Sequence, residues 1–148
     1  MKQLITIALA IVIPLLAACS EPDKPSVALY LAVQRGDLDQ LERHIHWGTD
    51  IDAILPNGQY PLQTAADRGR IIMVKTLLKH GADINRTNAD SNTALDLAIL
   101  SGRTQVAEVL LDQGAQLDAS ALLLEAAAAG VTDRDTVRFL TERGADLE

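Results

Sequence analysis

The sequence predicts an all-α repeat solenoid of about four repeats with polar end caps, preceded by an export signal. The first observation is a period, because two series of glycines advance in steps of 33 residues: Gly48, Gly81 and Gly114, and Gly36, Gly69 and Gly102. A period of this length is typical of a helical solenoid. The second is that the repeats carry similar helix start and stop signals, and the third is an apolar run at the N-terminus.

Residues 1–18 have the pattern of a secretory signal peptide that is cleaved from the mature protein. Lys2 supplies a positive start, and residues 4–18 are almost wholly apolar. The run is shorter than the ~20 residues that a membrane-spanning helix needs. A buried core helix is the alternative, but Pro14 and the absence of a polar face argue against it.

The signal ends in Leu16-Ala17-Ala18-Cys19, which resembles the lipobox of bacterial lipoproteins. The resemblance implies cleavage before Cys19 and attachment of diacylglycerol to its sulfur. A buried or free thiol is the alternative, but Cys19 is the only cysteine and has no second cysteine to pair with. By resemblance to the sorting rule of Gram-negative lipoproteins, Ser20 favours anchoring in the outer membrane, facing the periplasm.

Cleavage leaves 130 residues, enough for one domain, of which residues 27–148 form the repeats. The mature chain keeps 12 basic and 20 acidic residues, a net charge of −8. An acidic chain without basic clusters is a poor candidate for binding nucleic acid or anionic lipid through its own charge. Residues 19–26 then comprise the lipidated cysteine and a short tether, whose seven residues SEPDKPS span at most about 25 Å.

The third repeat shows most clearly how one unit is built. Thr93 can cap a helix that begins at Ala94, and Gly102 can end it. A second helix follows, with Leu110 at a core position and Gly114 at its end. One repeat earlier, Leu77 is the equivalent of Leu110, and Pro61 takes the first helical position, where its missing N–H costs nothing.

These repeats resemble the ankyrin repeat. The signature T-P-L-H-x-A survives as YPLQTA at 60–65 and TALDLA at 93–98, and G-A-D-x-N survives at 81–85. The resemblance implies helix-turn-helix pairs joined by hairpin-like turns, with repeats at approximately 27–52, 53–85, 86–118 and 119–148. Gln63 and Asp96 replace the signature histidine, and the fourth repeat departs most from the pattern. The charged second helices of the first and last repeats are suited to cap the ends.

The sequence offers no convergent reactive groups, so we expect neither an enzyme nor a cofactor or metal. His44 holds the place of Leu77 and Leu110, which favours a packed histidine, and His46 points away from it on a helix. His80 precedes a turn glycine and is expected to be exposed. Zinc-ligand spacing, a phosphate-binding glycine loop and a nucleophile elbow are all missing from the sequence.

By the same resemblance, a protein partner would contact the hairpin tips and the face of the first helices. The positions that match are Ile54, Leu55, Pro56, Asn57, Gln59, Tyr60, Asp67, Arg68, Thr87, Ala89, Asp90, Asn92, Leu100 and Ser101, with Gln34 and Arg35 in the first repeat. Ile54, Leu55 and Tyr60 are notable because bare apolar groups gain nothing in water but stabilise an interface. Local packing is the open alternative, for these three and for Trp47.

We therefore expect a lipid-anchored interaction module of the bacterial envelope. Two roles are considered: an immunity partner that neutralises a toxin or effector, and a helper of a periplasmic enzyme, for example in stress defence. A structural envelope component without a discrete partner is the alternative, and an enzyme is disfavoured. The acidic chain favours a partner with a basic patch. Neither nucleic acid nor a small-molecule substrate is expected as a partner.

Overall fold

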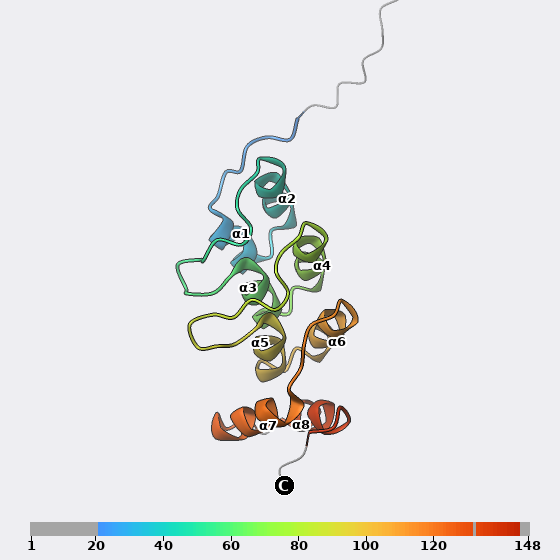
Figure 1. The fold of residues 1–148 in the computed structure, drawn as a ribbon. Coiled ribbons are helices and arrows are strands. Elements are labelled where there is room, and N and C mark those ends of the chain that lie inside the picture. Colours follow the sequence, from blue (N-terminus) through green and yellow to red (C-terminus); the bar gives the residue numbers. More distant parts are fainter. Residues whose placement is uncertain (1–20, 132, 146–148) are drawn as a thin grey trace, which may run out of the picture.

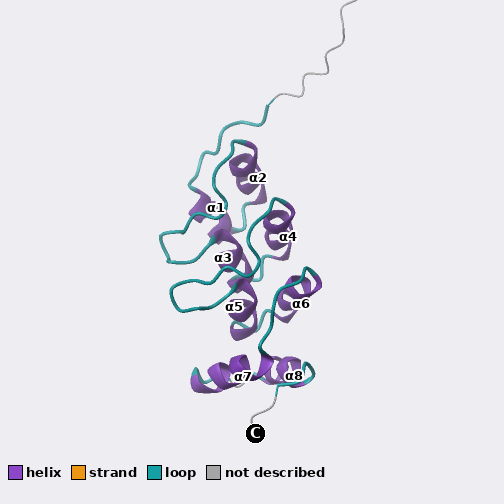
Figure 2. Cartoon of the chain, viewed as in Figure 1, coloured by secondary structure: helices purple, strands orange, loops and turns teal. Residues whose placement is uncertain are grey.

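The computed structural model describes residues 21–131 and 133–145, and within them it contains eight helices and no strand (Figures 1 and 2). The signal peptide, Cys19 and Ser20 lie outside the described residues. The helices are α1 (Leu29–Arg35), α2 (Leu38–His46), α3 (Pro61–Asp67), α4 (Ile71–Lys79), α5 (Ala94–Leu100), α6 (Thr104–Asp112), α7 (Ala119–Ala128) and α8 (Arg134–Thr141).

The helices form pairs that stack in chain order, which confirms the all-α repeat solenoid. The first helices of the pairs, α1, α3 and α5, pack in one row, and α2, α4, α6 and α8 pack in a second row. The loops between α2 and α3 and between α4 and α5 project to one side of the stack (Figure 2). Each repeat therefore buries its apolar faces against its neighbours.

The core runs between the two rows of helices. Leu77, Leu110 and Leu140 occupy equivalent places in α4, α6 and α8 and have no exposed surface. In the first repeat the same place is taken by His44, which is buried. Its Nδ1 lies 3.0 Å from Thr49 Oγ1 and its Nε2 lies 2.8 Å from the carbonyl oxygen of Val27. The prediction of a packed histidine is confirmed, and its hydrogen bonds explain how an imidazole is tolerated there.

The local signals for helix start and stop work as the sequence predicts. Pro61 is the first residue of α3. The hydroxyl of Thr93 accepts the N–H of Asp96, while the Asp96 carboxylate accepts the N–H of Thr93 at 2.8 Å, so α5 begins with a capping box. Gly102 then follows α5 in the left-handed conformation, with φ of 68°.

Gln63, which replaces the signature histidine, ties the second repeat to the next hairpin. Its Nε2 donates to the carbonyl oxygens of Arg86 at 2.9 Å and Asn92 at 3.0 Å, at the two sides of that hairpin. Its Oε1 accepts the N–H of Tyr60 at 3.1 Å. The side chain is almost fully buried. A glutamine amide thus supplies cross-repeat hydrogen bonds at this position.

Gln63→Leu is expected to lower the free energy of unfolding by roughly 2–6 kcal/mol, because two buried carbonyls lose their donor at roughly 1–3 kcal/mol each. Urea denaturation followed by circular dichroism measures the change. Gln105→Leu, on the exposed side of α6, is the matched control and should change stability by less than about 0.5 kcal/mol. Equal midpoints for the two variants would show that the amide does not hold the hairpin.

The fourth pair departs from the regular stack. α7 has 10 residues, whereas α1, α3 and α5 have 7 each, and it stands apart from α5 in Figure 1. Leu124 on α7 is 64% exposed, so polar cover at this end comes mainly from α8. Hydrogen bonds from Thr136 and from the backbone N–H of Asp135 hold the pKa of the Asp133 carboxyl, which caps α8, below its ordinary value.

The N-terminal segment is the main difference from the sequence prediction. Residues 20–26 were expected to form a free tether, but the structure places Pro22 to Val27 along α2. Trp47, at the end of α2, donates a hydrogen bond to this segment and is 42% exposed. The segment is therefore part of the folded domain, and only the residues before Pro22 are left as a tether.

Candidate protein-binding surface

The candidate surface combines two hairpin loops with the exposed ends and faces of the first helices. In the loop between α2 and α3, Leu55 N–H donates to the Gln59 carbonyl at 2.8 Å, and Gly58 follows with φ of 77°. In the loop between α4 and α5, Asn88 N–H donates to Asn92 at 3.0 Å. Ser91 holds the place of Gly58 with φ of 67°, a left-handed conformation that costs a non-glycine residue about 1–2 kcal/mol.

The structure separates the two apolar residues of the first hairpin. Ile54 is 61% exposed, whereas Leu55 is 7% exposed and belongs to the hydrophobic core. The assignment of Leu55 to the partner-binding surface is therefore wrong, because its side chain packs into the repeat stack. Pro56 and Asn57 are exposed beside Ile54, so the tip of this hairpin presents one large apolar side chain among small and polar ones.

Tyr60 is only half-buried and is engaged by its neighbour in the next hairpin. The guanidinium of Arg86 lies 4.9 Å from the centre of the Tyr60 ring, within the range of a cation–π contact. Arg86 also donates to the carbonyl oxygen of Asp52 at 2.9 Å. These contacts support the local-packing alternative for most of the Tyr60 ring and fix the two hairpins relative to each other.

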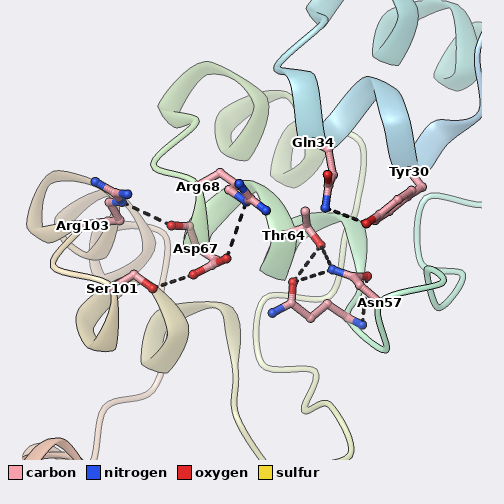
Figure 3. Close-up of polar contacts among 9 residues, drawn as sticks. Tyr30, Gln34, Asn57, Thr64, Asp67, Arg68, Ser101 and Arg103 are labelled. Carbon is pink, nitrogen blue, oxygen red and sulfur yellow. Dashed lines mark hydrogen bonds and ion pairs between the residues drawn. The ribbon is translucent and has the colours of Figure 1, made fainter. Parts of the chain in front are cut away.

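Figure 3 shows that polar side chains on this face are held by one another. Gln34 Nε2 donates to the Tyr30 hydroxyl at 2.7 Å on α1. Asn57 Nδ2 donates to Thr64 Oγ1 at 3.2 Å, and that hydroxyl donates to Gln59 Oε1 at 3.0 Å. Asn57 and Gln59 were assigned by sequence, and α3 now places Thr64 against them. A surface whose side chains are already ordered loses less entropy when a partner binds.

A second group lies where α3 and α5 end, at the right-angle turns to α4 and α6. Ser101 Oγ donates to the Asp67 carboxylate at 2.5 Å, and Arg68 Nε lies 3.8 Å from the same group (Figure 3). Arg103 donates to the Asp67 carbonyl oxygen at 3.2 Å. The structure thus brings together three residues assigned from sequence, Asp67, Arg68 and Ser101, across two repeats.

Sequence reasoning missed the arginines that follow the turn glycines. A Cβ atom added to Gly36 would lie 2.9 Å from Arg70 Cζ, and one added to Gly69 would lie 3.1 Å from Arg103 Cδ. Each arginine therefore lies over the glycine of the preceding turn. The signal was present in the sequence, because Gly-Arg recurs after 33 residues at both positions.

The remaining assigned residues border an acidic groove. Thr87, Ala89 and Asp90 are exposed on the second hairpin, while Asn92 and Leu100 are half-buried. An open groove of about 220 Å³ runs from this hairpin to α7 and is lined by Asp90, Ser91, Asn92, Asp96, Asp118, Ala121, Leu122 and Glu125. Four carboxylates and no basic residue line it, which suits a positively charged group.

Two further properties bear on the class of protein. In the described part of the chain, no three His, Cys, Asp or Glu side chains come close enough to hold a metal ion. Within the same residues, every helix is too short or too polar to span a bilayer.

The fold and this surface define a repeat protein that binds other proteins. A family model described as ankyrin repeats, in three copies, matches residues 29–121, more than half of the chain. The chain therefore belongs to the ankyrin-repeat family, whose repeats form non-catalytic modules for protein–protein interaction. The match ends within α7, where the stack becomes irregular. No curated protein matches the sequence.

Proposed function

We propose that this protein is a lipid-anchored interaction module of the bacterial envelope that captures a protein partner in the periplasm. The observation that carries the proposal is the position of the only cysteine, Cys19, directly after an apolar run and two alanines. Membership of the ankyrin-repeat family supports protein capture as the function of the rest of the chain. The outer membrane is the proposed site, because Ser20 follows the cysteine.

The partner-binding surface comprises the hairpin tips and the exposed ends of the first helices. Ile54 supplies an apolar anchor, and the acidic groove beside Asp90 supplies negative charge. We therefore propose a partner with a basic patch, whose affinity falls as salt concentration rises.

Two biological roles follow from periplasmic capture. The partner is either a toxin or effector that is neutralised by binding, or a stress-defence enzyme that is assisted. The neighbouring gene separates the two roles, since a toxin gene beside this one supports immunity. A structural envelope component, the alternative, has no discrete partner to capture.

Cys19→Ala is expected to abolish metabolic labelling with palmitate and to move the protein out of the membrane fraction, because the acyl chains would provide its attachment. Ser20→Ala is the matched control and keeps the lipobox, so it should be labelled like the wild type. The native protein should need detergent for extraction. Unchanged labelling of Cys19→Ala would end the lipoprotein proposal.

A further inference from the structure

Residues 22–27, here named the N-terminal clasp, hold on to the end of α2 through Trp47. The indole Nε1 of Trp47 donates to the Pro22 carbonyl oxygen at 3.1 Å, and the Lys24 ammonium lies 5.2 Å from the centre of the indole ring. Arg43 Nη1 lies 3.4 Å from the Asp23 carboxylate. The Asp23 side chain is largely exposed, so this ion pair by itself contributes little.

The other end of the clasp is held by buried groups. Ser26 N–H donates to Gln40 Oε1 at 2.8 Å, and the Val27 carbonyl lies 2.8 Å from His44 Nε2. Gln40 and His44 are both buried polar side chains of α2. Because a buried polar group that loses its partner costs about 1–3 kcal/mol, these two contacts fix the clasp to the first repeat.

The clasp limits how far Trp47 can be from a lipid anchor. Pro22 is three residues after Cys19 in the sequence, and three residues span at most about 10 Å. Acyl chains on Cys19 would hold that residue at the bilayer surface. Trp47, which is hydrogen-bonded to Pro22, must then lie close to the same surface. An amphipathic indole is favoured at this depth, between the headgroups and the acyl chains.

We propose that the N-terminal end of the solenoid, presented by Pro22, Lys24 and Trp47, rests in the lipid headgroup layer of the membrane. The inference rests on the acylation of Cys19 proposed above. Nearby charges balance, with Glu21 and Asp23 against Lys24 and Arg43, so the contact does not need anionic lipids. The clasp thereby orients the domain.

This orientation determines how the binding surface is presented. The pair α1 and α2 lies at one end of the stack, and α7 and α8 lie at the other end (Figure 1). With α2 at the membrane, the repeats project away from it, and the hairpins line one side of the projection. The acidic groove between the third and fourth repeats is then far from the lipid and open to a periplasmic partner.

The emission of Trp47 tests the contact, because Trp47 is the only tryptophan of the chain. The full-length protein is processed in a bacterial host, its acylation is verified by mass spectrometry, and it is reconstituted into phosphatidylcholine vesicles with bromine at shallow or deep acyl positions. We expect a blue shift of the emission and stronger quenching by shallow bromine. An acylated protein with unquenched emission overturns the contact alone. A mass without acyl groups overturns the anchor, and the contact with it.

The role of the clasp is tested in the same vesicles. The double variant Gln40→Ala, Arg43→Ala releases the clasp and should lose most of the quenching, whereas Arg138→Ala, at the opposite end of the stack, should keep it. Circular dichroism melting checks that each variant is folded. A flexible Gly-Ser insertion after Ser20 leaves the clasp intact and should also reduce quenching. Full quenching in both the released and the lengthened proteins would show that the clasp does not position Trp47.

Discussion

Leu77→Ala and Leu110→Ala are each expected to lower the free energy of unfolding by roughly 2–5 kcal/mol. Both side chains have no exposed surface and lie between the two rows of helices. Truncation removes their buried methyl groups and leaves a cavity that rigid, stacked helices fill only in part. In a solenoid each repeat is stabilised mainly by its neighbours, so damage in a central repeat weakens two interfaces.

The measurement is chemical denaturation followed by circular dichroism. Asp112→Ala is the control, because Asp112 is exposed at the end of α6 and a surface change there should matter by less than about 0.5 kcal/mol. If Asp112→Ala had the lower midpoint, the register that aligns the repeats would be wrong.

Much of the fold could be predicted from sequence because its signals are local and recur. Pro61, Thr93 and Gly102 act within one turn of a helix, so their roles do not depend on distant residues. The period then transfers what is known of one repeat to the next. This is how His44, at the place of Leu77, could be assigned to the core before any coordinates were considered.

The hairpin tips could not be resolved in the same way. Ile54 and Leu55 are adjacent and equally apolar, and the pattern of a loop does not say which side chain turns inward. The choice is made by the hydrogen bonds between Leu55 and Gln59 across the hairpin and by the space under the neighbouring repeat. Both depend on contacts that the period alone does not specify.

The clasp illustrates a second limit. A short segment with two prolines and three charges has the composition of a tether, and composition describes the segment by itself. Its docking depends on acceptors and donors supplied by α2, chiefly Gln40, His44 and Trp47. The fourth repeat shows the same limit, because the placement of α7 follows from a changed loop length and from packing against α8.

Ile54→Asp is expected to abolish capture of the partner while the melting temperature stays within a degree or two of the wild type's. Ile54 is 61% exposed in the free protein, so a carboxylate there remains solvated and leaves the fold intact. In the complex, an unpaired carboxylate would be buried at the interface, at a cost of several kcal/mol, on the order of a thousandfold in affinity.

The matched control is Ile72→Asp, because Ile72 is equally exposed at 59% but lies on α4, in the second row of helices. The partner is first identified by crosslinking and mass spectrometry from wild-type membranes, and then measured with each purified variant beside its thermal melt. Leu55→Asp should unfold the domain, since that side chain is in the core. Should Ile54→Asp unfold the protein, or should Ile72→Asp abolish binding equally, the hairpin tip is not the binding site. Retained binding by a folded Ile54→Asp leads to the same conclusion, because a buried carboxylate at the centre of an interface is not tolerated without a partner charge.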